Sequence, residues 1–189
     1  MSRLILNLGC GKKLMPNAVN VDITDYPGID QVVDLSKFPW PWPNDYADEI
    51  HLSHILEHFS DQKQFIYECW CMLKPGGLLH ISGPHASCIS SVGCLGHYRT
   101  YSYDTFRQYL SEPWYMFKKP LFKTVHQQLN WWYEETSAEG NIGPVMAKML
   151  EFVSWIITPL INISPRVFEN LWWPLVGGAR EVIWKGVKL

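Results

Sequence analysis

Two glycines and two carboxylates near the start of the chain have the types and spacing to bind a nucleoside. Gly9 and Gly11 flank Cys10 at the end of an apolar run, where a glycine turn lets backbone amides approach a ligand closely. Asp22 and Asp34 each end a later apolar run, and a carboxylate in that place can accept ribose hydroxyls. The combination predicts a nucleoside site, whereas either aspartate alone would be explained as a turn residue.

The glycine pattern differs from the one that binds dinucleotides. Leu14 stands where G-x-G-x-x-G requires its third glycine. Asp22 follows Gly9 by 13 residues, fewer than the usual ~20, so almost no first crossover helix is expected. These two departures disfavour a nicotinamide-dependent oxidoreductase.

Histidines gather in two later segments, and imidazole suits proton transfer at neutral pH. The first segment is His54–His58, which follows a short strand pattern. Its H-x-x-E-H spacing matches a zinc-protease motif, which we reject because that motif needs a long helix and a different fold. Glu57 and His58 could instead position this segment through hydrogen bonds.

The second segment starts at Pro84 and contains His85, His97 and Arg99. His97 is the first candidate for a general base and His85 the second. Arg99 could bind an acidic group of a substrate through its forked guanidinium. A solvated surface loop would account for the same residue types.

Short strands and turns must position these side chains. Apolar runs predict strands at 4–8, 18–22, 31–35, 47–52 and 78–82, and helical spacing predicts a helix at 62–73 that Lys74-Pro75-Gly76-Gly77 stops. Further patterns predict a helix at 103–110, strands at 123–132 and 181–188, and a mostly helical stretch at 144–173 interrupted by Pro159 and Pro165. Alternating strands and crossovers indicate a parallel sheet.

Composition is that of one globular domain over residues 1–189. Hydrophobic residues make up 47% and charged residues 18%, and the formal net charge of -2 argues against nucleic-acid binding. The five cysteines form no CxxC pair, and the chain starts without a signal-peptide pattern, so we expect reduced thiols and a cytoplasmic location. The apolar run 152–163 is expected to be too short to span a bilayer, so no transmembrane segment is predicted.

The segments LNLGCGKK, VNVD, DL, ADEIHLSHILEHF and MLKPGGLLHIS, in this order over residues 4–83, resemble the successive motifs of small class I S-adenosylmethionine-dependent methyltransferases of the type 11 kind. The end of the chain, from Pro165 to Leu189, is similar to the closing segment of the same group. The resemblance implies an α/β, Rossmann-like fold. Its mostly parallel seven-stranded sheet would have the order 3-2-1-4-5-7-6, with a helical insert before the last strand.

The resemblance also implies that S-adenosylmethionine binds at these strand ends and leaves as S-adenosylhomocysteine. The methionine part would lie against Gly9, Cys10, Gly11 and Ser53, the ribose against Asp22, and the adenine against Asp34 and Leu35, with Leu8, Ile23 and His54 completing the cofactor set. The catalytic candidates are His97, His85 and His58.

The expected reaction is methylation of an oxygen or nitrogen atom in a small-molecule or glycan acceptor. One alternative is a module that binds the adenosyl cofactor without catalysis. Another is a metal-dependent RNA methyltransferase, because small-RNA 2′-O-methyltransferases use an ExxEH cluster, although His54 replaces the first glutamate here. We expect no metal.

The insert, at about 134–178, is rich in tryptophan and has one broad apolar face. That face comprises Val145, Met146, Met149, Leu150, Phe152, Val153, Ile156 and Ile157, with Lys148, Glu151 and Ser154 opposite. Packing over the sheet, a lid over an apolar acceptor, a homodimer surface and peripheral membrane contact would each explain it. The polar face is poor in Lys and Arg, so we favour a lid or a dimer element.

Overall fold

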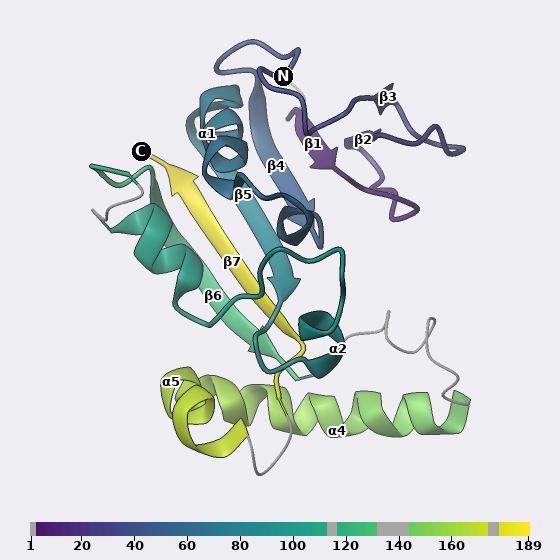
Figure 1. The fold of residues 1–189 in the computed structure, drawn as a ribbon, viewed down its shortest axis with the longest axis vertical. Helices are drawn as coiled ribbons and strands as arrows, with labels where there is room; N and C mark the ends of the chain where they lie inside the picture. The colour runs from purple at the N-terminus through teal and green to yellow at the C-terminus, as the bar shows by residue number, and fades with distance from the viewer. Residues whose placement is uncertain (1–2, 113–116, 132–143, 174–177) are drawn as a thin grey trace.

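Seven strands form a single sheet in the order β3-β2-β1-β4-β5-β7-β6 (Figure 1). The computed structural model of the chain describes residues 3–112, 117–131, 144–173 and 178–189. The strands are β1 (Ile5–Leu8), β2 (Val19–Asp22), β3 (Gln31–Val32), β4 (Ala47–Ser53), β5 (Leu73–Pro84), β6 (Phe122–Asn130) and β7 (Glu181–Lys188). The first five pair in parallel, whereas β7 runs antiparallel to both β5 and β6. This confirms the expected fold class and strand order.

The strand β3 is shorter than the predicted run 31–35. It lies at the edge of the sheet and pairs only with the end of β2, Val21 with Gln31 and Asp22 with Val32. Asp34 then accepts hydrogen bonds from the amide and hydroxyl of Ser36, which turns the chain away from the sheet. Local turn chemistry therefore ends the strand early.

The helix α1 (Gln62–Met72) connects β4 to β5 and packs on the sheet (Figure 1). Asp61 caps it by accepting a hydrogen bond from the Gln64 amide. Its buried residues Phe65, Ile66, Cys69 and Met72 belong to the same core as the strands. The helix stops before Lys74-Pro75-Gly76-Gly77 as predicted, but these four residues lie inside β5, where the register with β4 shifts.

The two faces of the sheet differ in burial. One face carries apolar side chains that are at most 2% exposed: Leu6, Leu8, Ile50, Leu52, Leu79, Ile81, Val182 and Trp184. Alternate residues point the other way and are half-buried, several of them polar, including His51, Ser53, His80, Ser82 and Lys185. Parallel sheets are usually covered on both faces. Here the connection from β1 to β2 consists of turns, which confirms that the first crossover helix is missing.

The remaining helical elements follow β4, β5 and β6. They are the short η1 (Leu56–His58), α2 (Ile89–Val92) and η2 (Arg107–Ser111), then α4 (Pro144–Ile163), α5 (Pro165–Val167) and η3 (Phe168–Trp172). The predicted interruption at Pro159 is wrong, because α4 continues through this residue, whereas Pro165 does begin a new helix. Trp132 of the predicted strand 123–132, and residues 134–143 and 174–177 of the predicted insert, lie outside the described residues.

Helix α4 is longer than the apolar run 152–163 on which the expectation about the membrane was based. The helix extends back from that run to Pro144, and the window Val145–Ile163 has a mean hydropathy of 1.3. By length and composition alone it could cross a bilayer. Figure 1 shows α4 lying across the ends of β6 and β7, apart from the layer formed by α1.

Candidate active site

The turn after β1 is built from two glycines with left-handed backbone conformations. Gly9 has a φ of 63° and Gly11 a φ of 53°. A Cβ on Gly9 would lie 2.3 Å from Cγ1 of Ile55, so this residue packs directly against the segment after β4. A Cβ on Gly11 would meet nothing within 4 Å. Gly9 therefore fixes the turn, and Gly11 leaves open space at its Cα for a ligand.

Asp22 lies beside this turn and holds it. Its Oδ2 accepts a 2.7 Å hydrogen bond from the Gly11 amide, and its Oδ1 accepts one of 3.0 Å from the Thr24 amide. Each carboxylate oxygen has a second lone pair, so the same side chain can still accept ribose hydroxyls. The next residue, Ile23, is 62% exposed and offers an apolar surface at the same strand end.

The end of β3 differs from the expected adenine contact. Leu35 is 5% exposed and belongs to the hydrophobic core, so its side chain cannot flank a bound ring. Its carbonyl accepts a hydrogen bond from the Trp40 indole, which draws the chain inward. Asp34 remains partly exposed, and hydrogen bonds from Ser36, assisted by Lys37, hold its pKa below the usual range. The predicted role of the Leu35 side chain is therefore wrong.

Two other members of the predicted cofactor set, Cys10 and Ser53, line a cavity of about 360 Å³. His51 and His80 line it as well, and their rings stack with centroids 4.2 Å apart. Burial and the neighbouring His51 lower the pKa of His80 to about 4. Glu49, His51 and His80 offer ligand atoms within 4.8 Å of one another, so this group could hold a metal ion.

His54 lies between two carboxylates and joins the end of β4 to β7. Its Nδ1 is 3.3 Å from Oε1 of Glu57, and its Nε2 is 3.0 Å from Oε1 of Glu181. Burial opposes protonation, but the hydrogen bond to Glu181 and the negative charges of Glu181 and Glu57 outweigh it and raise the pKa of His54 to about 9. Asn130 donates to the second oxygen of Glu181. At neutral pH His54 is therefore a buried cation that links three strands.

His58 and His97, predicted separately as catalytic candidates, come together in the structure. Their ring centroids are 4.8 Å apart. Nδ1 of His58 is 3.0 Å from the Gly96 carbonyl and Nδ1 of His97 is 3.0 Å from the Ser91 carbonyl. A carbonyl only accepts, so each Nδ1 carries the proton and donates, which leaves each neutral ring a lone pair on Nε2.

Glu57 lies beside this histidine pair and is fully buried. Neither of its carboxylate oxygens has a hydrogen-bond partner among the described residues, although His54 forms an ion pair with it. Glu57, His58 and His97 offer ligand atoms within 4.8 Å of one another. The group can accept a proton through a histidine, and it could also hold a divalent cation.

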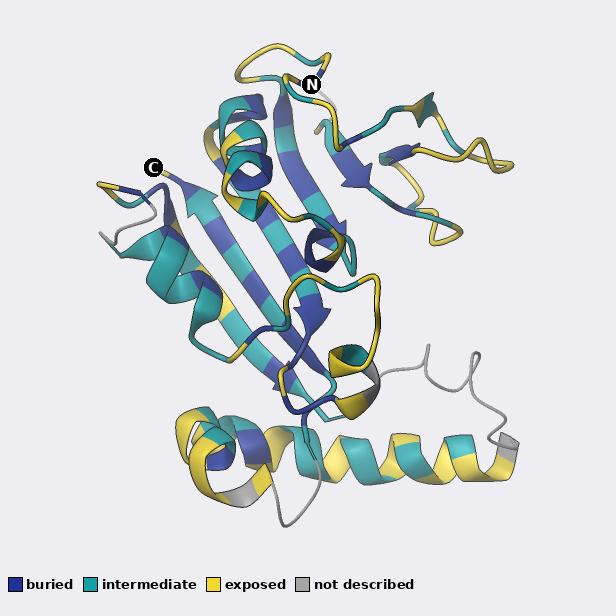
Figure 2. Ribbon diagram, viewed as in Figure 1, coloured by how far each residue is buried: buried dark blue, intermediate teal, exposed yellow. Residues whose placement is uncertain are grey.

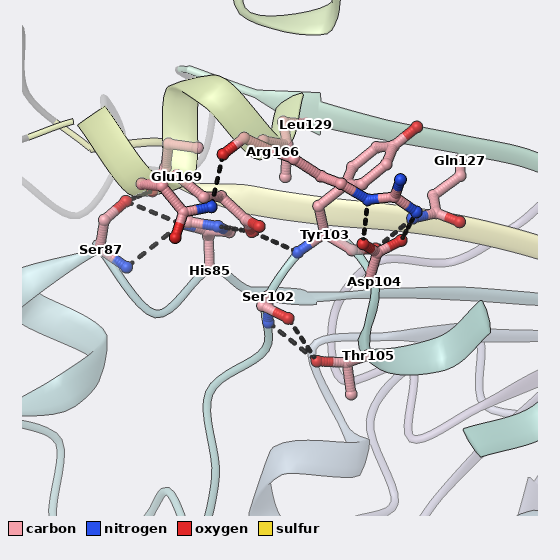
Figure 3. A network of polar contacts seen from close by, with 12 residues as sticks. His85, Ser87, Ser102, Tyr103, Asp104, Thr105, Gln127, Leu129, Arg166 and Glu169 are labelled. Atoms are coloured by element: carbon pink, nitrogen blue, oxygen red, sulfur yellow. Dashed lines mark hydrogen bonds and ion pairs between the residues drawn. The ribbon is translucent and has the colours of Figure 1, made fainter. Parts of the chain in front are cut away.

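His85, the second predicted base, is committed to structural hydrogen bonds (Figure 3). It is 3% exposed. Its Nδ1 accepts from the amide of Ser87 at 3.1 Å, so Nε2 carries the proton and donates to Glu169 at 2.8 Å. Glu169 also accepts from the Tyr103 amide. The geometry therefore gives His85 a positioning role, because both ring nitrogens are in use and η3 is tied to the end of β5.

Arg99 lines a separate cavity of about 450 Å³ next to the start of α1. Tyr101 forms one wall, and its hydroxyl accepts a hydrogen bond of 3.1 Å from the side chain of Gln62. The Tyr101 ring is 2% exposed, and burial raises the pKa of its hydroxyl well above the usual range. Arg99 is exposed and could bind an acidic group there, as the sequence predicted.

Residues 6–81 match a family model described as a methyltransferase domain. The match includes the glycine turn, Asp22 and the segment His54–His58. Over this segment the chain is similar to methyltransferase domains. No curated protein sequence matches it.

Solved structures share the fold of this chain at low identity. An S-adenosylmethionine-dependent methyltransferase from Archaeoglobus fulgidus superposes with a TM-score of 0.59 and 16% identity, covering 98% of this chain and 86% of that one. The complex between the Haloferax volcanii Trm112 methyltransferase activator and a putative methyltransferase superposes with a TM-score of 0.54 and 13% identity. The match covers 99% of this chain and 83% of that one. The (4+2) cyclase SpnF superposes with a TM-score of 0.55 and 13% identity, covering 99% of this chain and 75% of that one. Since a cyclase shares the fold, the reaction must be argued from the site.

Two carboxylates that contact predicted site residues were not identified from the sequence. Glu169 contacts His85 across 84 residues of chain, and Glu181 contacts His54 across 127. Both lie beyond the segment that matches the family model. No local pattern marks them, because their roles arise only when the last third of the chain folds back onto β4 and β5.

Proposed function

We propose that this protein transfers a methyl group from S-adenosylmethionine to an oxygen or nitrogen atom of a small-molecule or glycan acceptor. The observation that carries the proposal is the glycine turn, where Gly11 faces open space beside the carboxylate of Asp22. This turn lies within the segment that matches the methyltransferase family.

The residues around the turn fit an adenosyl cofactor. The open space at the Cα of Gly11 suits the methionine part, and the remaining lone pairs of Asp22 suit the ribose hydroxyls. The exposed side chain of Ile23 provides an apolar surface for the adenine. When bound, S-adenosylmethionine supplies an electrophilic methyl carbon on a sulfonium, so the protein must orient the acceptor and remove its proton.

His97 is proposed to take that proton through Nε2. The hydrogen bond from Nδ1 to Ser91 keeps the lone pair of the neutral ring on Nε2. The side chain is partly exposed, and His58 lies against its edge. A proton from an acceptor hydroxyl or ammonium group can therefore pass to His97 and on to solvent.

A metal-assisted version is favoured by one observation, the buried carboxylate of Glu57 beside two histidines with available nitrogens. A divalent cation held by Glu57, His58 and His97 would polarise an acceptor hydroxyl, so that no histidine need act as base. Turnover that is lost with a chelator and restored by Mg²⁺ or Zn²⁺ would select this version. Turnover that a chelator leaves unchanged would select the histidine base.

Titration calorimetry of the full chain tests the cofactor assignment. We expect S-adenosylmethionine and S-adenosylhomocysteine to bind with micromolar affinity, and NAD to give no signal. Asp22→Asn should weaken adenosyl binding at least tenfold (about 1.4 kcal/mol) because one carboxylate acceptor becomes an amide donor. Asp25→Asn, at an exposed site three residues along, is the control. Tight NAD binding, or equal adenosyl affinity in both variants, would overturn the proposal.

Release of S-adenosylhomocysteine over a panel of acceptors tests the role of His97. We expect His97→Ala to reduce turnover by about 10²-fold or more while cofactor affinity stays unchanged, since general-base catalysis contributes on that scale. His126→Ala, at an exposed position of β6, should behave as wild type. Cofactor binding without turnover on any acceptor would indicate the non-catalytic module instead.

A further inference from the structure

Helix α4 contacts the rest of the protein through a polar strip and through Ile161, which is buried in the hydrophobic core. Ser154, Thr158 and Asn162 recur every four residues and so lie on one side of the helix. The Asn162 side chain donates a 2.7 Å hydrogen bond to the carbonyl of Leu129 and accepts one of 2.9 Å from its amide, at the end of β6. The hydroxyl of Thr158 accepts one of 3.3 Å from the Trp131 amide. The polar side of α4 therefore faces inward.

The opposite side of α4 is apolar and exposed. This outer face consists of Val145, Met146, Met149, Phe152, Trp155, Ile156, Leu160 and Ile163, which are 44% to 82% exposed. Only 6% of the apolar window Val145–Ile163 is buried within the protein, as the yellow and teal of α4 in Figure 2 show. A surface helix in water has the reverse arrangement. Something apolar must therefore cover the outer face.

We propose that the outer face of α4 inserts, in the plane of a membrane, into the lipid of one leaflet. At 3.6 residues per turn the face covers about 180° of the helix. A packed helix buries a stripe of ~100°, so lipid matches the breadth of the face better than a second helix does. The two charged residues of the window, Lys148 and Glu151, lie toward one edge of the face near Trp155, where they can reach the headgroups.

The connections of α4 require an in-plane position. With 20 residues, the helix is about 30 Å long, which matches the hydrocarbon thickness of a bilayer. However, β6 before it and β7 after it pair along their whole length, from Phe122 with Lys188 to Asn130 with Glu181. Both ends of the helical segment therefore lie on one side of a membrane. A segment that crosses a membrane and returns to the same side needs two membrane-spanning helices. Among the described residues, α4 is the only helix long and apolar enough to cross, so an in-plane position fits better.

An apolar groove beside the outer face strengthens the case for lipid. It has a volume of about 370 Å³ and is lined by Ile157, Leu160, Ile161, Ile163, Ser164, Val167 and Phe168. Six of these seven side chains are hydrocarbon or aromatic, which suits an acyl chain and offers almost nothing to a polar ligand. The exposed Val167 and Leu171 continue the apolar surface onto α5 and η3.

Co-flotation of the full chain with neutral phosphatidylcholine vesicles tests this proposal. We expect the wild-type protein to float with the vesicles, and the floating fraction to stay unchanged as salt rises from about 0.1 M to about 0.5 M, because insertion here rests on apolar contact and little on charge. The double variant Phe152→Asp, Leu160→Asp should reduce the fraction at least tenfold. These side chains are 63% and 57% exposed, so the fold itself does not depend on them.

The matched control is the double variant Val125→Asp, Leu189→Asp, at exposed apolar positions of β6 and the C-terminus. It should float like the wild type. Circular dichroism melting of all three proteins confirms equal folding, and light scattering reports their oligomeric state. Failure of the wild type to float, or equal loss in both double variants, would overturn the proposal. A dimer that only the α4 variant abolishes, without flotation, would assign the outer face to a second copy of the chain instead.

Discussion

The positive charge on His54 is a stabilising feature of the folded protein. Glu57 and Glu181 approach its two ring nitrogens, and Asn130 holds Glu181 from the other side. The charge lies between the end of β4 and the paired ends of β6 and β7. Its loss would leave two buried carboxylates without their cation, and removing one partner of such a group is strongly unfavourable.

This arrangement predicts that the folded protein loses stability as the pH becomes alkaline. The pKa of His54 is about 9 in the folded protein and 6.5 when unperturbed. The stabilisation is therefore complete below about pH 6.5 and is lost as pH rises through about 9, with an upper value of about 3 kcal/mol. Urea unfolding of wild type and His54→Gln should show a difference that shrinks between about pH 6 and about pH 10. A difference that stays constant over this range would contradict the assignment.

Individual side chains were the hardest features to predict from the sequence. His54 and His58 are four residues apart in one motif, yet they serve different sites. His54 has a left-handed φ of 51° and contacts β7, whereas His58 follows in η1 and contacts the loop that carries His97. Leu35 was wrong for a related reason, because the turn at Ser36 was not visible as the end of a strand.

At the scale of elements, the turn between β1 and β2 combines two glycines with separable tasks. Gly9 is enclosed by Ile55, and Gly11 is open. The short crossover between these strands was predicted from the spacing of Gly9 and Asp22, and the structure has turns there. The elements themselves were largely predictable, since their buried runs and caps are local. Pro159 was the exception, because packing of α4 against β6 through Thr158 and Asn162 outweighs the local preference of proline.

A matched pair of substitutions separates the two tasks. Gly9→Ala should destabilise the protein by about 3 kcal/mol, because the new methyl group would overlap Ile55 and φ is positive. Gly11→Ala should cost only about 1 kcal/mol of stability. It should nevertheless weaken adenosyl binding at least tenfold, because its Cβ enters the open space assigned to the ligand. Urea unfolding and calorimetry measure the two effects. Wild-type cofactor affinity in Gly11→Ala would show that the ligand lies elsewhere.

At the scale of the whole molecule, the order of the seven strands followed from the resemblance of residues 4–83 and of the chain end to known motifs. The sequence did not predict which side of α4 lies against the rest of the protein. Its apolar residues were recognised in the sequence, but burial inside the protein and exposure to another phase give the same pattern. The hydrogen bonds of Thr158 and Asn162 to Trp131 and Leu129 distinguish these two explanations, and only the structure shows these bonds.

The pairing of Asn130 with Glu181 means that the helical segment begins and ends at one point of the sheet. The β6–β7 ladder already brings the two ends together, so the entropy of closing this excursion grows only slowly with its length, by about 0.6 kcal/mol per doubling. Insertions, deletions and changes of polarity that spare Asn162 and Glu169 should therefore leave the seven strands almost unchanged. Related enzymes could diverge in what they dock against while the cofactor turn stays constant.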